Sequence, residues 1–298
     1  MKEKKPKKQR TPEQRRDFLR SLCFLFPSLL GVGLFFVLPF GVVVYYSLID
    51  GVASRKFVWL DNFRKLFENS AFRLAAGNTL RFSAVAVPLA VILAIVLALL
   101  LEARIPLKSY FRTFFLSPMM VPVASVVLVW QVLFSYNGTI NVLLSRFGGA
   151  PVDWLQSDYA PIVVVVLFLW KNLGYNMVLF MAGIANIPKE LLEVADVEGA
   201  SEWYKFFHIK LRYLSPTVLF VTILSLINSF KVFREVYLLT GNYPYQTLYT
   251  LQHFMNNMFG SFDYPKLSSA AVLMAIAMVI IIAVLFALED WFGKDVEG

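Results

Sequence analysis

The stretch Lys189–Leu211, "KELLEVADVEGASEWYKFFHIKL", differs sharply from the sequence around it. The chain on both sides is almost continuous hydrocarbon, whereas here charged and apolar residues alternate at helical spacing around one glycine, Gly199. Pro188 suits a first helical turn, and Gly199 can adopt the left-handed conformation that ends a helix. The pattern predicts a helix over about 188–198, a glycine corner, and a second helix capped by Ser201.

The two predicted helices carry charge in an ordered way. Glu202 follows the cap of the second helix, and Lys210 and Arg212 lie near its end, as the helix dipole favours. The first helix places Leu191, Leu192 and Ala195 on one apolar face beside Glu193, Asp196 and Glu198. Such a helix can insert into a groove of a soluble partner, or it can be an ordinary interfacial hairpin.

The composition sets the class of protein. The chain has 298 residues, of which 58% are hydrophobic and only 16% are charged. This is outside the usual range of soluble domains and predicts an all-α integral membrane protein. One Cys and two His exclude a disulfide framework and a histidine-rich metal centre, so we expect no metal ligands. We also expect no catalytic residues.

Apolar runs long enough to cross a bilayer number six. A span needs roughly 20 residues, and the predicted spans are 21–48, 79–101, 113–135, 160–184, 215–239 and 268–292. They divide the chain into a basic tail, 1–20, and a six-span domain, 21–298, with the loop 187–212 between spans four and five. The first run is too long for a signal-peptide core and is expected to be retained.

The basic residues orient these spans. Nine of the 28 Lys and Arg residues lie within the first 20 positions, which favours a cytoplasmic anchor over a nucleic-acid site, because no basic-aromatic interleaving accompanies them. With the N-terminus inside, 17 Lys and Arg residues face the cytoplasm and seven face outward. Both termini and the loop 187–212 are therefore predicted to be cytoplasmic.

The outer segment 60–77 permits two interpretations. Leu60, Phe63, Phe67 and Leu74 recur at roughly helical spacing among charges, so the segment is either a helix lying at the outer interface or an ordinary solvated loop.

Polar residues inside spans are costly and usually face a cavity or a neighbouring helix. Candidates for the substrate path are Asn172, Tyr175, Asn176, Ser225, Asn228 and Ser229. Amides, hydroxyls and an aromatic face suit a neutral polyol, although Ser and Asn also join helices in membranes. Lys231 and Glu235 are four residues apart, which predicts an ion pair in an outer-end cluster with Arg234. Trp130 is expected to pack, and the role of Gln131 is left open.

No Gly-x-x-x-x-Gly-Lys-Ser/Thr sequence occurs, so the chain is not expected to be an ATPase. Any work that it does must then be driven by another polypeptide, or by an ion gradient if the chain is a self-contained secondary transporter or channel. The secondary transporter would need buried acids for ion coupling, and few occur. An intramembrane hydrolase would need a catalytic pair, which the spans do not offer.

The loop 187–212 resembles the EAA loop of permease subunits of ATP-binding-cassette importers. The family pattern is Glu-Ala-Ala, three residues, Gly, then Ile-x-Leu-Pro after about nine more, and here the corresponding stretches are "EVADVEGA" (193–200) and "IKLR" (209–212). Further matches to the carbohydrate-uptake branch, the maltose, lactose and glycerol-phosphate type, are "LDNF" (60–63), "NT" (78–79), "GTIN" (138–141), "DWL" (153–155), "WKNLGYNM" (170–177), "IPKEL" (187–191) and "VYLLTG" (236–241).

This resemblance implies a type I importer permease of the bacterial cell membrane. It implies as partners a second permease subunit, a cytoplasmic ATPase dimer that binds ATP and Mg, and an extracytoplasmic solute-binding protein that delivers a sugar. The residues implied at the ATPase joint are Glu193, Ala195, Glu198, Gly199 and Ala200. Val194, Glu198 and Arg212 depart from the motif, and "LLTGNYP" (238–244) departs from the family's "LLTGGP" in an outer loop where the solute-binding protein would dock.

Overall fold

The computed structural model describes residues 12–102 and 107–293. Within these ranges the chain is helical, and its extended pairing is limited to an isolated bridge between Ile49 and Phe57. The expected all-α class is confirmed. The tail 1–20 falls partly outside the described residues, since only its last part is described, as the start of α1 (Pro12–Val32).

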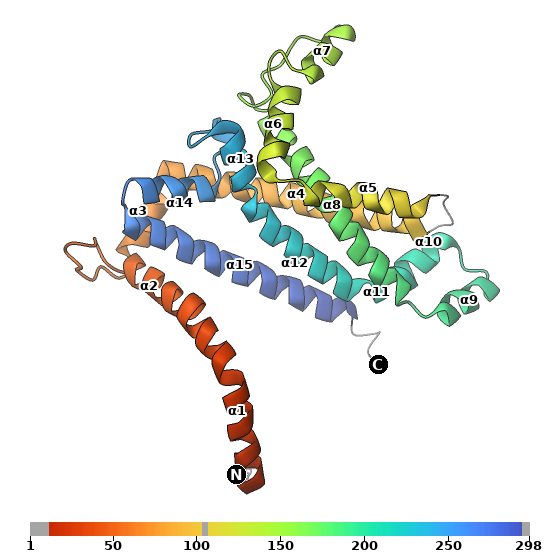
Figure 1. Cartoon of the computed structure of the whole chain (residues 1–298), viewed down its shortest axis with the longest axis horizontal. Helices are drawn as coiled ribbons and strands as arrows, with labels where there is room; N and C mark the ends of the chain where they lie inside the picture. Colours follow the sequence, from red (N-terminus) through yellow and green to blue (C-terminus); the bar gives the residue numbers. More distant parts are fainter. Residues whose placement is uncertain (1–11, 103–106, 294–298) are drawn as a thin grey trace.

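Four long helices form the body: α4 (Ser70–Glu102), α8 (Ala160–Ala185), α12 (Ser215–Lys231) and α15 (Tyr264–Gly293). They lie side by side along the long axis of the molecule (Figure 1). α4 packs against both α8 and α12, and it does so with a row of alanines four residues apart. These residues, Ala86, Ala90, Ala94 and Ala98, have no exposed surface. Small side chains let membrane helices approach closely, so this row sets the central packing.

Within residues 12–102 and 107–293, six helical stretches are long and apolar enough to cross a membrane. They are Cys23–Ser47, Ser70–Glu102, Val123–Arg146, Ala160–Ala185, Ser215–Thr240 and Tyr264–Trp291. The first runs through α1, a π-helical turn η1 (Gly33–Val37) and α2 (Leu38–Ser47). α2 packs against α15, while α1 extends away from the body (Figure 1). Six spans are thus found where six are predicted.

The two ends of the body carry different elements. One end holds α3 (Asp61–Glu68), the short η3 (Gln246–Leu248) and α14 (Leu251–Gly260); the opposite end holds α9 (Lys189–Val197) and α10 (Glu202–Lys205) (Figure 1). α3 and the first turns of α4 make segment 60–77 helical instead of an irregular loop. Asn62 and Asn78 fix this end, because their amides donate to backbone carbonyls of residues 47 and 49 and of residues 246 and 249.

The predicted helix over 113–135 is interrupted. α5 (Lys108–Met120) ends before Val121, and α6 (Val123–Phe134) begins after Pro122, in a different direction (Figure 1). Proline disfavours helical geometry in the residue before it, and Val121 is extended with ψ of 129°. α6 is followed by α7 (Thr139–Arg146), so the apolar stretch of the third span begins later than predicted.

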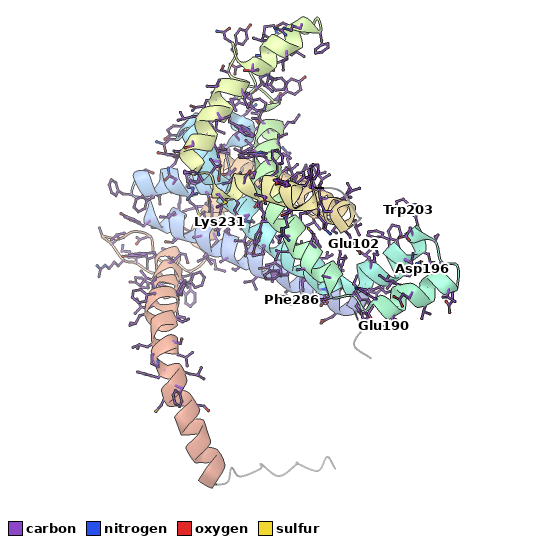
Figure 2. The ribbon with its side chains drawn as sticks, turned by 45° about the vertical axis from the view of Figure 1, so that its right-hand side comes forward. Glu102, Glu190, Asp196, Trp203, Lys231 and Phe286 are labelled. Carbon is purple, nitrogen blue, oxygen red and sulfur yellow. The ribbon has the colours of Figure 1, made fainter. Side chains whose placement is uncertain are left out.

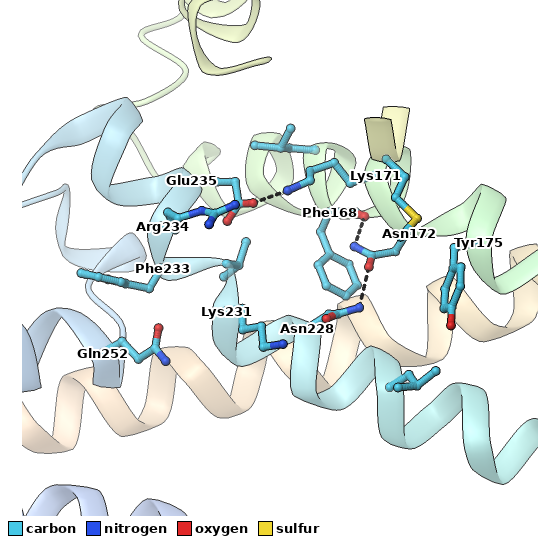
Figure 3. A pocket seen from close by; sticks show the side chains of 14 residues that line it. Phe168, Lys171, Asn172, Tyr175, Asn228, Lys231, Phe233, Arg234, Glu235 and Gln252 are labelled. Atoms are coloured by element: carbon cyan, nitrogen blue, oxygen red, sulfur yellow. Dashed lines mark hydrogen bonds and ion pairs between the residues drawn. The ribbon is translucent and has the colours of Figure 1, made fainter. Parts of the chain in front are cut away.

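The predicted fifth span, 215–239, also consists of two helices. α12 ends at Lys231, and α13 (Phe233–Thr240) begins after Val232. The break places Phe233, Arg234 and Glu235 beside the end of α12 and turns Glu235 toward Lys171 of α8 (Figure 3), whereas the ring of Phe233 packs on His253 of α14. This change of direction opens the cavity described below.

Candidate functional site

A cavity of about 690 Å³ lies between α8, α12 and α13 (Figure 3). Its volume is in the usual range for small-molecule sites. The lining residues are Met119, Leu167, Phe168, Lys171, Asn172, Tyr175, Leu224, Asn228, Lys231, Val232, Phe233, Arg234, Glu235 and Gln252. We call this space the polar cavity, because amides and charges lie among its apolar walls.

Helical spacing explains which side chains reach the polar cavity. On α8 the residues at 168, 171, 172 and 175 share one face, and on α12 the residues at 224, 228 and 231 do. Gly174 lets α8 approach α5 closely, since an added Cβ would lie 1.8 Å from the carbonyl oxygen of Phe115 on α5. A side chain at 174 would therefore push α5 away and move the cavity wall.

A chain of amides crosses the polar cavity. Asn228 Nδ2 donates to Asn172 Oδ1 at 2.9 Å, and Asn172 Nδ2 donates to the carbonyl of Phe168 at 2.8 Å (Figure 3). Tyr175 lies one turn along α8, and its hydroxyl makes no hydrogen bond to the described part of the chain. Asn172, Tyr175 and Asn228, three of the six predicted substrate-path residues, thus line one cavity.

The other three predicted residues are buried in helix contacts. Asn176 Nδ2 donates to Ser225 Oγ at 2.9 Å, and the hydroxyls of Ser229 and Ser83 lie 2.8 Å apart. Asn176, Ser225 and Ser229 are each at most 2% exposed. They join α8 to α12 and α12 to α4, so substrate contact by these three stays a prediction.

The charges of the polar cavity are arranged differently from the prediction. Glu235 pairs with Lys171 of α8 and not with Lys231 (Figure 3). The predicted pairing is wrong because the helix breaks at Val232, so the four-residue spacing no longer places the two side chains on one face. Within the described residues, Lys231 and Arg234 form no ion pair.

The aromatic and amide residues of α6 have structural contacts. Trp130 is 8% exposed and packs on Trp170 and Phe134, as expected. Gln131 lies within 3.5 Å of the carbonyl oxygens of Leu238 and Leu239. Trp130 thus packs α6 against α8, and Gln131 holds α6 against α13; neither residue lines the polar cavity.

The loop 187–212 has the predicted form of helix, glycine corner and helix. α9 ends in a Schellman motif, in which the N–H of Ala200 donates to the carbonyl of Ala195 and that of Gly199 donates to Asp196. Gly199 has a φ of +77°. Ser201 caps α10, since its hydroxyl accepts from the backbone N–H of Tyr204 at 3.2 Å.

Two lysines tie this loop together and to the body. Lys205 Nζ pairs with Asp196 of α9 at 2.5 Å and also with Glu202. Lys210 Nζ pairs with Glu102 at 3.1 Å, at the end of α4. Figure 2 shows Asp196, Trp203 and Glu190 together at this end of the molecule, with Glu102 nearby. The chain then continues through a π-helical turn, η2 (Phe206–Lys210), and α11 (Leu211–Tyr213) into α12.

The surface of α9 differs in part from the predicted apolar face. Ala195 is 7% exposed and faces the loop, whereas Leu191, Val194 and Val197 are exposed on one stripe. The periodicity alone could not show this, because the fold of α10 over α9 decides which side is covered. Glu193 and Glu198 are exposed beside the stripe. The loop thus presents an acidic and apolar surface to the outside.

The inter-helix role of Lys205 was not identified from the sequence. Its partner Asp196 lies nine positions earlier, across the corner, and no short helical spacing connects the two. Among the described residues, no group of three His, Cys, Asp or Glu side chains is placed to hold a metal ion.

Comparisons with known proteins place this arrangement in context. Residues 86–298 match the family model described as binding-protein-dependent transport system inner membrane component. The lactose transport system permease protein LacF of Rhizobium radiobacter is 27% identical over 279 residues, which cover 91% of this chain and 93% of LacF. The trehalose/maltose transport system permease protein MalF of Thermococcus litoralis is 28% identical over 285 residues, which cover 94% and 96%.

A solved structure supports the fold. A chain of a bacterial alginate ABC transporter, crystallised in complex with an alginate pentasaccharide-bound periplasmic protein, superposes with a TM-score of 0.80. The match covers 95% of this chain and 97% of that chain, at 21% sequence identity. At this identity the likeness concerns the fold.

Proposed function

The chain belongs to the family of binding-protein-dependent transport system inner membrane components, and from this premise we propose that it is the permease subunit of an ATP-driven importer for a sugar or oligosaccharide. The sugar would be delivered by an extracytoplasmic solute-binding protein. Relatives named for lactose and for trehalose and maltose transport support the substrate class.

The observation that carries this proposal is the loop 187–212. It is a helical corner with an exposed acidic and apolar surface, and it is tied by Lys210 to α4 and continues through η2 and α11 into α12. α12 in turn lines the polar cavity. A partner that moves the corner would therefore move helices that bound the cavity.

The coupling mechanism follows from this connection. An ATPase dimer that binds ATP and Mg closes on nucleotide binding and draws two such loops together, which rocks the helices from an inward-open to an outward-open state. Glu193 and Glu198 contact the ATPase, while Ala195, Gly199 and Ala200 keep the corner in shape. The chain itself performs no covalent chemistry.

The polar cavity is the proposed sugar path. Asn172 and Asn228 offer amide donors and acceptors, and Tyr175 offers a hydroxyl and an aromatic face. These groups suit the hydroxyls and apolar faces of a sugar ring. Asn176, Ser225 and Ser229 lie behind the wall of the polar cavity, where their hydrogen bonds hold α8, α12 and α4 together.

The setting of the importer is part of the same proposal. The chain lies in a bacterial cell membrane with both termini inside, beside a second permease subunit, and no nucleic acid is involved. The exposed apolar surface of α1 and η1 is available to lipid and to that second subunit. The segment 238–244, at the end of α13, faces the solute-binding protein.

Co-purification with ATPase measurements tests this assignment. A tagged chain is expected to retain a second permease and an ATPase from native membranes, and ATP hydrolysis by the complex is expected to rise with sugar-loaded solute-binding protein. Purification of the chain as a self-contained unit, with no ATPase attached, would contradict the proposal.

A further inference from the structure

We propose that the sugar recognised by this chain carries a negative charge, such as a carboxylate, sulfate or phosphate group. The inference rests on the proposed function and specifies the substrate class of the same cavity. It comes from the charged residues of the cavity wall, which a neutral polyol does not require.

The polar cavity has an excess of positive charge. Three cations line it, Lys171, Lys231 and Arg234, against a single carboxylate, Glu235. Glu235 is already engaged by Lys171. Lys231 and Arg234 have no ion-pair partner within the described residues, so the wall keeps a net charge of two positive units.

Several cations elsewhere in the described chain have acidic partners. Lys65 pairs with Asp61, Lys205 with Asp196 and Lys266 with Asp263. Like charges that face one cavity repel, and this repulsion grows where water is partly excluded. Lys231 and Arg234 are both exposed, so water screens this repulsion in part and a bound anion can reach both cations.

The polar groups are also arranged along one direction. Lys171 of α8 lies next to Glu235, Asn172 bonds to Asn228, and Asn176 bonds to Ser225. These contacts show that α8 and α12 run antiparallel past each other. The cations thus lie at one end of the polar cavity, the amides in the middle, and Tyr175 beyond them (Figure 3).

This order fits a ligand with two chemically different ends. The planar guanidinium of Arg234 can form two parallel hydrogen bonds to an oxyanion, and Lys231 adds a point charge beside it. The hydroxyls of the sugar ring then reach Asn172 and Asn228. Figure 2 shows Lys231 on the helical body, far from the loop 187–212.

The test uses the assembled importer in proteoliposomes with its own solute-binding protein. ATP-driven uptake is measured for matched pairs of radiolabelled compounds: galactose and galacturonate, glycerol and glycerol phosphate, glucose and glucose sulfate. The variants are Lys231→Gln, Arg234→Gln and the double variant, with Lys231→Arg and Arg234→Lys to keep the charge. Arg146→Gln is the matched control, because it removes one exposed cation outside the cavity.

The anionic member of at least one pair is expected to be taken up in preference. Its uptake rate should fall by roughly ten-fold in the double variant, about the size expected for losing charge-assisted hydrogen bonds. The charge-preserving variants and Arg146→Gln should retain most uptake.

Preferred uptake of a neutral member, or equal uptake by wild type and the double variant, would overturn the inference and leave the proposed function intact. An acidic residue of the second permease that neutralised both cations would give the first of these results, because neutral sugars would then be transported. Uptake of no compound in any pair would contradict the proposed function and this inference with it.

Discussion

Lys205 of α10 and Asp196 of α9 form an ion pair at 2.5 Å across the corner made by Gly199. The side chain of Lys205 is only 8% exposed, although it lies in a loop at one end of the molecule. The hydrogen bonds that Lys205 donates to Asp196 and then to Glu202 raise the pKa of its ammonium group above the ordinary value. The two helices of the loop are thereby held as one unit, as is required if the ATPase moves the transmembrane helices through this loop.

Breaking this pair should uncouple ATP hydrolysis from transport. Lys205→Gln and Asp196→Asn are each expected to lower the number of sugar molecules imported per ATP hydrolysed, because the ends of the corner can move independently. The double variant should be little worse than either single variant, since both remove one interaction. Lys266→Gln, which breaks the pair with Asp263 at the opposite end, is the control. Additive losses in the double variant would show that the pair does not act as a joint.

The conformation of Gly199 gives a second prediction with an unusually close control. Gly199 and Gly148 have φ angles of +77° and +81°, and an added Cβ meets nothing within 4 Å at either position. Alanine at either site should cost about 1–2 kcal/mol of local strain. Only Gly199→Ala is expected to reduce uptake, and Gly199→Pro should abolish it while the protein still inserts in the membrane. Equal uptake by the two alanine variants would remove the corner from the mechanism.

Local signals along the sequence accounted for the loop 187–212 well. Proline, glycine and serine each act on the backbone within a few residues, so Pro188, Gly199 and Ser201 were placed correctly at helix ends. The Lys205–Asp196 pair depends on how one helix folds over another, which periodicity does not contain. Arg212, where the family has proline, lies within α11, and Pro216 begins α12 one turn later.

The cavity amides give a third prediction. Asn228→Ala and Tyr175→Phe should each slow sugar uptake by a few-fold and affect it more than basal ATP hydrolysis, because they remove groups that face the polar cavity. Ser225→Ala should instead lower thermal stability by about 0.6 kcal/mol, typical of a helix–helix hydrogen bond in a membrane. The measurements are uptake kinetics and thermal unfolding in detergent. A larger uptake loss for Ser225→Ala than for Asn228→Ala would reverse this assignment.

A buried histidine makes stability depend on pH. Burial lowers the pKa of His253 to about 4, and its Nδ1 accepts from the hydroxyl and N–H of Thr250. The unfolded chain takes up a proton near pH 6.5, whereas the folded chain does so only near 4. The contribution of the neutral His253 imidazole to stability is therefore fully present above pH 6.5. It is lost as the pH falls toward 4, which lowers the free energy of unfolding by at most about 3 kcal/mol.

His253→Gln should flatten the thermal stability of the complex between pH 6.5 and 4 relative to the wild type. Tyr249→Phe, a change beside His253 that leaves the imidazole in place, serves as the control. The same slope for wild type and His253→Gln would contradict the role of this imidazole.

The positions of the spans could be read from hydropathy, but their interruptions could not. Pro122 is visible in the sequence, yet prolines such as Pro88 and Pro27 lie inside continuous helices. At Val232 neither proline nor glycine marks the break, and the Lys231–Glu235 prediction failed there. The cavity itself depends on this break, so its lining could be predicted only in part, through Asn172, Tyr175 and Asn228.

The most direct measurement of the central claim is sugar uptake into proteoliposomes that contain the complete complex and its solute-binding protein. With ATP inside and no ion gradient, uptake should proceed, and Gly199→Pro should stop it. Uptake that runs on a proton or sodium gradient without ATP, and that is unchanged by Gly199→Pro, would show a self-contained secondary transporter and contradict the account.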